Sequence, residues 1–240
     1  MQADVFFTPG EMDPGTAQGA AAVVIDVCRA TTTMVEALAH GAPRIFPTTS
    51  AEEAVKLASS LGREDTVLCG ERKAVKIEGF DLGNSPGEFT REVIEGKRLV
   101  MSTTNGTPAI AAVHEARRVA ICAFTNLGAT ASAIADEERL VLLCAGREGR
   151  FALEDALCAG QLLVRLGAGK RRGPSMNDAA RAAVALAGAF TPDVAFLKST
   201  AAGRSLDAIG LAGDLDICGD VDRHSVVVVM SDGALVVARD

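Results

Sequence analysis

The stretch Val23–Thr33, VVIDVCRATTT, decides the fold, because an apolar, β-branched run passes through small hydroxylic residues into an alanine-rich segment. Such a run is typical of a buried parallel strand that leads directly into a helix. Three further stretches have the same shape: Leu99–Thr107, LVMSTTNGT; Val119–Thr130, VAICAFTNLGAT; and Val141–Gly149, VLLCAGREG. The ends of parallel strands lie along one edge of an open α/β sheet, where ligands bind. We therefore expect the polar residues that follow these four strands to converge.

The same alternation continues along the chain and predicts an α/β fold in which alternating strands and helices form a mostly parallel, mixed sheet. The expected strands are Asp4–Thr8, Ala22–Val27, Arg44–Phe46, Thr66–Cys69, Arg98–Ser102, Arg118–Ala123, Arg139–Ala145, Ser225–Met230 and Ala234–Ala238. The expected helices are Thr32–Ala39, Ala51–Leu61, Gly87–Glu95, Thr107–His114, Leu127–Ala135, Leu153–Leu166 and Asn177–Ala187. Glycine-broken pieces in Gly188–Gly219 predict two short helices, followed by an antiparallel hairpin at Ser231–Gly233, SDG.

The chain of 240 residues contains no linker rich in Gly and Ser or in Pro. We therefore predict a single domain over residues 1–240. The alternative is two sub-lobes, about 1–125 and 126–240, which would have to pack closely together.

Composition argues against nucleic-acid and membrane partners. The formal net charge is -7, and Trp and Tyr are absent, so neither a basic face nor an aromatic platform is available. The basic trio Lys170–Arg172 is interpreted as a solvated loop. The N-terminal sequence lacks a signal-peptide pattern, and no apolar run reaches the length of about 18 residues that a membrane span needs. We expect a cytoplasmic protein.

The six cysteines form no Cys-x-x-Cys pair and lie mostly in or beside apolar runs, so we expect reduced core residues. Cys28 beside Arg29 is a candidate nucleophile, but a packing role is favoured. The chain lacks the phosphate-binding P-loop motif, the G-x-S-x-G elbow and, after its first strand, the G-x-G-x-x-G fingerprint.

Asp26 follows a strand that is otherwise continuously apolar, where a carboxylate is costly unless it is paired or binds a cation. Arg29 stands three residues further on, and its guanidinium is well shaped to bind phosphate or carboxylate. Thr31 and Thr32 place hydroxyls at a predicted helix start, where free N–H groups favour an anion. The alternative for Asp26 is a helix-capping or loop-tying role.

The segment Gly70–Pro86, GERKAVKIEGFDLGNSP, mixes charged and turn residues with little periodicity, which is common in functional loops. Glu71 and Asp81 are candidate ligands for Mg²⁺, because this cation takes one or two carboxylates and keeps waters for substrate oxygens. The residues alone leave a structural alternative equally open: Asx turns at Asp81 and Asn84, and a surface ion pair between Glu71 and Arg72.

The Asn-Gly pair in the stretch Ser102–Thr107, STTNGT, is a strong signal for a hairpin turn. The residues that follow have helical spacing instead, with Pro108 in a first-turn position. We therefore predict a strand-to-helix turn whose hydroxyls and backbone N–H groups face a phosphate, without the lysine of a P-loop. The residues of this predicted cradle are Ser102, Thr103, Thr104, Asn105, Gly106 and Thr107.

The stretch Ala145–Gly160, AGREGRFALEDALCAG, places Arg147 just past a strand and two acidic residues in the first turn of a helix. Arg147 is a candidate ligand for an anion. Glu154 and Asp155 favour the helix dipole in any case, so a purely structural role competes with a catalytic one.

In their order along the chain, VVIDVCRATTT, GERKAVKIEGFDLGNSP, STTNGT and CAGREGRFALEDALCAG resemble the motifs of the 2-phosphosulfolactate phosphatase family. The resemblance covers most of the chain and is weaker after about Leu166. It implies a Mg²⁺-dependent phosphomonoesterase with the family's own α/β fold, expected to be a homodimer or another homo-oligomer. The implied reaction converts 2-phospho-3-sulfolactate to 3-sulfolactate and phosphate, as in coenzyme M biosynthesis, although a related small phosphorylated hydroxy-acid stays open as the substrate.

The residues and the resemblance together support one mechanistic hypothesis. Mg²⁺ is held by Asp26, Glu71 and Asp81 in some combination, while Arg29 and the predicted cradle neutralise the developing charge. Water is the expected nucleophile with a carboxylate as base, and a phospho-aspartyl intermediate on Asp26 is the alternative. Residues expected to bind the substrate are Thr31, Thr32, Arg72, Lys76, Asn84, Ser85, Arg147 and the six cradle residues.

Two other functions stay open. A non-catalytic module that binds a small anionic metabolite would use the same helix starts but would not require carboxylates around a cation. A nucleotide-binding protein is disfavoured, because the glycine fingerprints are absent.

Overall fold

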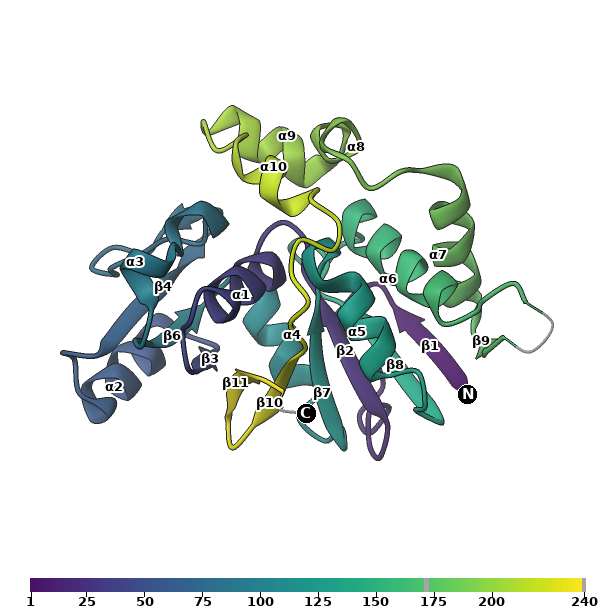
Figure 1. Ribbon diagram of the computed structural model, residues 1–240, viewed down its shortest axis with the longest axis horizontal. Coiled ribbons are helices and arrows are strands. Elements are labelled where there is room, and N and C mark those ends of the chain that lie inside the picture. The colour runs from purple at the N-terminus through teal and green to yellow at the C-terminus, as the bar shows by residue number, and fades with distance from the viewer. Residues whose placement is uncertain (171–172, 239–240) are drawn as a thin grey trace.

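The computed structural model describes residues 1–170 and 173–238, and these residues form an 11-stranded sheet with helices on its faces (Figure 1). The strand order is β5-β4-β6-β3-β11-β10-β7-β2-β8-β1-β9. Two mostly parallel blocks are joined in the middle by an antiparallel hairpin. The predicted α/β fold with a mostly parallel, mixed sheet is therefore confirmed.

The first block contains the two strands whose sequences are most continuously apolar. Its strands are β7 (Arg118–Cys122), β2 (Ala21–Ile25), β8 (Arg139–Cys144), β1 (Gln2–Phe6) and the short β9 (Ser175–Met176). Val24 pairs with Ile121 on one side and with Leu143 on the other. Because β2 is buried along its whole length, every one of its residues is apolar.

The second block carries the segment that was predicted as a functional loop. Its strands are β4 (Thr66–Arg72), β6 (Arg98–Ser102), β3 (Ile45–Thr48) and the short antiparallel β5 (Val75–Lys76). Lys73 and Ala74 form a two-residue turn between β4 and β5, with φ angles of 52° and 66°. Because neither residue favours a positive φ, the sequence did not predict this hairpin.

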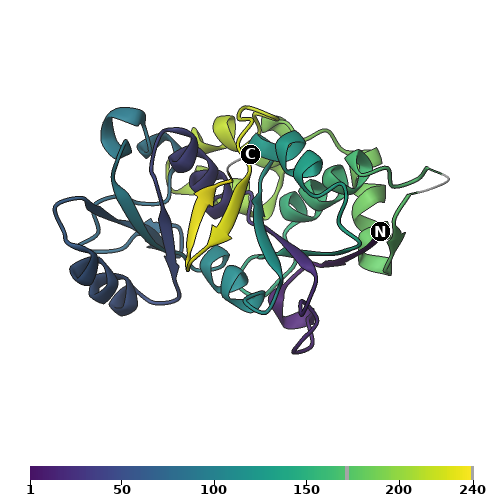
Figure 2. The same ribbon diagram turned by 60° about the horizontal axis from the view of Figure 1, so that its bottom comes forward.

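The predicted C-terminal hairpin is confirmed, and it lies in the middle of the sheet. Strands β10 (Val228–Ser231) and β11 (Ala234–Val237) pair antiparallel across a turn at Asp232 and Gly233. β10 pairs with β7 of the first block, and β11 pairs with β3 of the second. Figure 2 shows this hairpin, in yellow, between the blue strands of one block and the teal and purple strands of the other.

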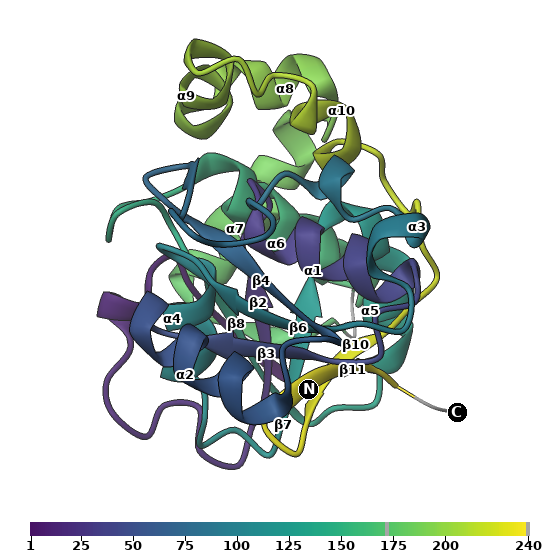
Figure 3. The same ribbon diagram turned by 90° about the vertical axis from the view of Figure 1, so that its left-hand side faces the viewer.

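The helices cover the sheet on both faces, as Figure 3 shows for α2 and α4 on one side and α6 and α7 on the other. Alternate side chains of β2 point to opposite faces of the sheet. Ala21, Val23 and Ile25 belong to one buried cluster together with residues of α5 and α6, whereas Ala22 and Val24 belong to another that includes residues of α1 and α4. The helices are α1 (Ala30–Ala39), α2 (Ala51–Leu61), α3 (Arg91–Ile94), α4 (Gly106–Ala112), α5 (Leu127–Ala133), α6 (Leu153–Arg165), α7 (Asp178–Ala189), α8 (Val194–Ser199), α9 (Ala201–Ala208) and α10 (Asp214–Cys218).

Two helix predictions need correction. Instead of one helix over Gly87–Glu95, the chain forms a single 3₁₀ turn at Pro86–Glu88 and the short α3, because Thr90 between them is extended. Instead of two short helices in 188–219, three form: α8, α9 and α10, above the upper end of the sheet in Figure 1. Thr200 separates α8 from α9, since its hydroxyl accepts a hydrogen bond from Gly203 N and starts the second helix.

Three further expectations concern the chain as a whole. No described helix combines the length and the apolar character needed to cross a membrane. All six cysteines are free thiols, as predicted. Of the basic trio Lys170–Arg172, Lys170 lies in an exposed bend, and Arg171 and Arg172 lie outside the described residues.

Candidate active site

The carboxyl ends of β2, β4, β6 and β8 meet at one edge of the sheet and surround a pocket of about 200 Å³. Three of the four strand ends that were predicted to converge, those of β2, β6 and β8, line this pocket, whereas the segment after β7 does not. Helix α9 contributes Ala202, Ser205 and Leu206 to the wall of this pocket. The other lining residues are Asp26, Cys28, Arg29, Glu71, Lys73, Ala74, Asn84, Thr104, Asn105, Gly146, Arg147, Glu148, Glu154 and Asp155. The pocket is therefore built from segments spread over almost the whole sequence.

Asp26 directly follows β2 and is almost completely buried in the pocket wall. Its Oδ1 accepts a hydrogen bond of 3.3 Å from Ala30 N, and its own N–H donates to the Thr31 hydroxyl. Burial raises the pKa of Asp26 to about 7, and the nearby charges of Glu71 and Glu154 act in the same direction. Asp26 therefore exchanges its proton near neutral pH, which few carboxyl groups do.

Gly106 at the start of α4 lies directly against Asp26. A Cβ atom on Gly106 would be 2.8 Å from Asp26 Oδ2 and 2.5 Å from the Cβ of Ala30. Such contacts are far shorter than atoms tolerate, so only glycine fits here. Gly106 permits a close approach between α4 and the loop after β2.

Asp155 ties together the ends of β2 and β8. Its Oδ1 accepts a hydrogen bond of 2.8 Å from Val27 N, and its Oδ2 accepts one of 3.1 Å from Gly146 N. Burial raises the pKa of Asp155, and the charges of Asp26 and Glu154 raise it further. The Asp155 carboxylate thus fixes the distance between two strand ends and adds negative charge to the pocket.

Glu154, in the first turn of α6, is also buried and lines the pocket. Burial raises the pKa of Glu154, and the nearby charge of Arg147 opposes this rise. A buried carboxyl group with a raised pKa, beside two other acids in a pocket, is a candidate general base.

Glu71 at the end of β4 holds the β4–β5 turn against the loop after β6. Its Oε1 accepts from Thr104 N at 2.6 Å, and its Oε2 accepts from the Thr104 hydroxyl at 3.0 Å and from Ala74 N at 2.7 Å. The carboxylate already has three donors, so it orders two of the pocket loops.

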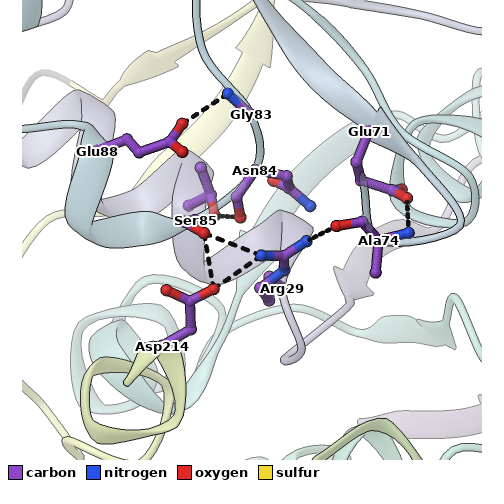
Figure 4. A network of polar contacts seen from close by, with 9 residues as sticks. Arg29, Glu71, Ala74, Gly83, Asn84, Ser85, Glu88 and Asp214 are labelled. Carbon is purple, nitrogen blue, oxygen red and sulfur yellow. Dashed lines mark hydrogen bonds and ion pairs between the residues drawn. The ribbon is translucent and has the colours of Figure 1, made fainter. Parts of the chain in front are cut away.

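Arg29 joins three segments at the pocket wall (Figure 4). Its Nη1 donates to the Ser85 hydroxyl at 3.0 Å and forms an ion pair of 2.7 Å with Asp214 of α10, while Nη2 donates to Ala74 O at 2.9 Å. Both charged side chains are largely buried. The Arg29 charge is therefore paired with Asp214 within the protein.

Asn84 presents an unpaired polar atom at the pocket. The residue is 4% exposed, and its Oδ1 is buried without a hydrogen-bond partner among the described residues. The Thr33 hydroxyl donates to the backbone oxygen of Asn84 and fixes this residue in place. Because buried polar atoms are normally paired, an unpaired oxygen at a pocket wall points to a bound ligand.

Most of the sequence matches one known family. A profile described as 2-phosphosulpholactate phosphatase matches residues 6–233. The chain belongs to the 2-phosphosulfolactate phosphatase family. The resemblance seen in the motifs is therefore confirmed, and the matched range includes every strand-end segment that lines the pocket.

Relatives with this name come from distant organisms. The chain is 35% identical over 239 residues to a "Probable 2-phosphosulfolactate phosphatase" of Clostridium perfringens (strain 13 / Type A), covering 98% of this chain and 96% of that protein. It is 38% identical over 216 residues to a protein of the same name from Thermotoga petrophila, with 90% and 91% covered. A third, from Gloeobacter violaceus, is 37% identical over 230 residues, with 95% and 94% covered.

In this member of the 2-phosphosulfolactate phosphatase family, Asp81 lies away from the pocket. Its carboxylate forms an ion pair of 3.1 Å with Arg63 and accepts a hydrogen bond of 2.8 Å from Leu68 N. Asp81 therefore holds the loop after β5 against β4, and it is not among the candidate metal ligands. Arg72, Lys76 and Ser85 also lie outside the pocket lining.

Most of the threonine hydroxyls predicted to bind substrate are bound to backbone instead. Thr31 donates to Asp26 O, and Thr32 donates to Val27 O, so both complete the turn before α1. Thr103 and Thr107 exchange hydrogen bonds with each other across the start of α4. The Ser102 hydroxyl donates to Thr48 O and accepts from Arg72. Of the predicted cradle, Thr104 and Asn105 line the pocket.

Several pocket residues were not predicted from the sequence. For Glu154 and Asp155 the sequence left a structural role at the helix dipole and a catalytic role both open, although two buried acids in one turn are unusual. No recognisable sequence motif marks Lys73 or Glu148, which both have positive φ angles. The same is true of the residues of α9 that line the pocket.

One other cluster of potential metal ligands among the described residues lies away from the pocket: Glu36, His40 and His224. His224 Nε2 lies 2.6 Å from Glu36 Oε1, and Arg223 Nε lies 3.1 Å from the same oxygen. Arg223 thus already neutralises this buried carboxylate, and the cluster ties the segment before β10 to α1.

Proposed function

We propose that this protein hydrolyses 2-phospho-3-sulfolactate to 3-sulfolactate and phosphate, with Mg²⁺ as its cofactor. The observation that supports this function best is the charge of the pocket at the strand ends. Its described lining carries five carboxylates, of Asp26, Glu71, Glu148, Glu154 and Asp155, but only three cationic side chains, of Arg29, Lys73 and Arg147. Because the carboxylates outnumber the cationic side chains, the pocket would repel an anionic phosphate ester. A phosphatase with such a pocket needs a further positive charge to bind its substrate.

The residues present fit a hard divalent cation. Mg²⁺ binds carboxylate and amide oxygens and takes only one or two carboxylates from the protein. We assign Asp26 and the unpaired oxygen of Asn84 as its protein ligands, because Asp26 Oδ2 has no hydrogen bond among the described residues and Asn84 Oδ1 has none either. The bound cation would supply charge neutralisation and polarisation of the phosphoryl oxygens.

Glu154 is the proposed general base. A water molecule attacks phosphorus and gives a proton to the Glu154 carboxylate while the bond from phosphorus to the ester oxygen breaks. The ester oxygen takes a proton from solvent water to become the hydroxyl of 3-sulfolactate, and Glu154 returns its proton to solvent, which restores the base. Water is preferred over Asp26 as nucleophile, because Asp26 is assigned to the cation. Arg147, beside Glu154, is placed to contact the phosphate or another anionic group.

The experiment that tests this function measures phosphate release from 2-phospho-3-sulfolactate with Mg²⁺ and with EDTA. We expect turnover with Mg²⁺ and none with EDTA. Asp26→Asn should lower turnover by about a thousandfold or more and leave the fold intact, since the amide has nearly the shape of the carboxyl group. Substrate binding without phosphate release would instead indicate a non-catalytic binding module.

Two accompanying expectations come from the family resemblance, a homodimer and a role in coenzyme M biosynthesis, and a third, a cytoplasmic location, comes from the sequence pattern. The first is checked by light scattering on the purified chain. A mass of twice 24.7 kDa is expected.

A further inference from the structure

The turn between β4 and β5 forms part of the pocket and has an uncommon sequence. Lys73 and Ala74 both have positive φ angles, a conformation that Asn and Gly adopt most readily in two-residue turns. A lysine in this conformation is strained, and strained residues that persist in a structure are concentrated at functional sites. The turn therefore gives a reason to ask what the Lys73 side chain does.

The backbone of this turn is held in place from three sides. Ala74 N donates to Glu71 Oε2 at 2.7 Å, and Ala74 O accepts from Arg29 Nη2 at 2.9 Å. Lys73 N donates to the Thr104 hydroxyl at 3.3 Å. Because each of these partners also lines the pocket, the turn keeps a fixed position relative to it. Lys73 is thus mounted on an ordered part of the wall.

The charge of Lys73 is the least committed of the three cationic side chains in the wall. Arg29 is paired with Asp214 at 2.7 Å, and Arg147 Nη1 donates to Ala201 O at 3.1 Å. The Lys73 ammonium has no ion pair or hydrogen bond with any residue that the structure describes. Lys73 is exposed, whereas Asp26 is buried in the wall of the same pocket. Lys73 therefore lies at the mouth of the pocket, where it opens to solvent.

We propose that Lys73 is a specificity-determining residue whose ammonium binds an anionic group of the substrate that does not react. This inference rests on the proposed function. With the phosphoryl group beside Asp26, the remainder of the substrate points toward the mouth of the pocket and carries a carboxylate and a sulfonate. An ammonium on an ordered turn is suited to bind either of these groups.

The experiment compares Lys73→Asn with two matched variants. Lys73→Asn removes the charge and keeps a residue that favours the turn. Lys73→Arg keeps the charge at the same position. Lys76→Gln removes a charge from β5, close in sequence but outside the pocket lining. The kcat and KM of each are measured with Mg²⁺ on 2-phospho-3-sulfolactate, on 2-phospholactate, which lacks the sulfonate, and on p-nitrophenyl phosphate, which lacks both groups.

We expect Lys73→Asn to raise the KM for 2-phospho-3-sulfolactate about tenfold with little change in kcat, as for the loss of one charge-assisted contact. Lys73→Arg should restore most of the affinity, and Lys76→Gln should leave KM unchanged. A similar rise for 2-phospholactate would identify the carboxylate as the bound group, and a rise confined to 2-phospho-3-sulfolactate would identify the sulfonate. The KM for p-nitrophenyl phosphate should not change.

Two results would overturn the inference. An unchanged KM in an active Lys73→Asn protein would show that the ammonium contacts no substrate group. An equal rise in KM for all three esters would show that it acts on the phosphate or on the general potential. If the wild-type protein releases phosphate from none of the three esters, the proposed function itself fails, which is a different outcome from either.

Discussion

The Asp214 carboxylate lies 2.7 Å from Arg29 Nη1, and this buried ion pair fastens helix α10 to the loop that follows Asp26. Asp214→Asn leaves the Arg29 charge buried without its partner. Breaking such a pair typically costs about 3 kcal/mol, which corresponds to a loss of about 6–12 °C in melting temperature for a chain of this size. Thermal denaturation followed by circular dichroism measures this loss.

The double variant Arg29→Met/Asp214→Leu is the control for that experiment. Because it removes both charges together, it should recover much of the lost stability while activity stays low. A melting temperature of Asp214→Asn equal to that of the wild type would contradict a stabilising role for the ion pair.

Gly106→Ala should damage the site, because the new methyl group would be 2.8 Å from Asp26 Oδ2 and 2.5 Å from the Ala30 Cβ. We expect a loss of about 1–3 kcal/mol in stability and a clear fall in kcat. The matched control is Gly188→Ala in α7, where a Cβ meets nothing within 4 Å and should stabilise the helix by about 0.5–1 kcal/mol. Equal behaviour of the two variants in denaturation and turnover would argue against a close approach at Gly106.

The pH dependence of activity should reflect Asp26. Its pKa is raised to about 7, so the carboxyl group is neutral below that pH and must lose its proton before it can bind a cation. We expect kcat/KM to fall as the pH decreases through about 7, and more Mg²⁺ to move this fall to lower pH, because the cation and the proton compete. An acid limb that does not respond to the Mg²⁺ concentration would exclude Asp26 as a ligand.

Glu154→Gln should separate activity from stability. As the proposed base, Glu154 should contribute about 10²–10⁴-fold to turnover. Burial raises the pKa of Glu154 in the folded protein above its value of 4.5 in the unfolded chain. The ionised carboxylate therefore destabilises the folded protein at a pH above the folded-state pKa, and this effect is absent at a pH below 4.5. The metal-free variant should therefore melt at a higher temperature than the wild type at pH 8, and this difference should shrink toward pH 4. A variant that is both active and no more stable would contradict the assignment.

The architecture was predictable where a strand is buried on both faces. β2 and β8 are almost continuously apolar because their residues, apart from Arg139 at the start of β8, are buried, and such a run is typical of a strand that helices cover on both sides. The β4–β5 hairpin was missed because its turn residues, Lys73 and Ala74, disfavour the conformation that they adopt. There the contacts of Ala74 with Glu71 and Arg29 outweigh local preference.

The site was predictable only in part, because the same residue types can either bind a ligand or hold the backbone in place. Asp26 stood out as a carboxylate that ends an apolar strand, and the structure places it in the pocket. Asp81 was indistinguishable from Glu71 by composition, and only the position of Arg63 shows that it faces away. Threonine hydroxyls bind anions and also close turns, and Thr31 and Thr32 do the latter.

The position of the β10–β11 hairpin has a consequence for how the protein is made. Asp26 and Glu154 belong to one parallel block, whereas Glu71 belongs to the other, and among the strands that the structure describes only β10 and β11 bridge the two. These two strands follow all the other described strands along the chain, so during synthesis both blocks emerge from the ribosome before any strand can join them. The sheet beneath the pocket is thus completed in one late step, and a ribosome-bound chain arrested before Val228 would carry the pocket's acidic residues on two blocks that no strand connects.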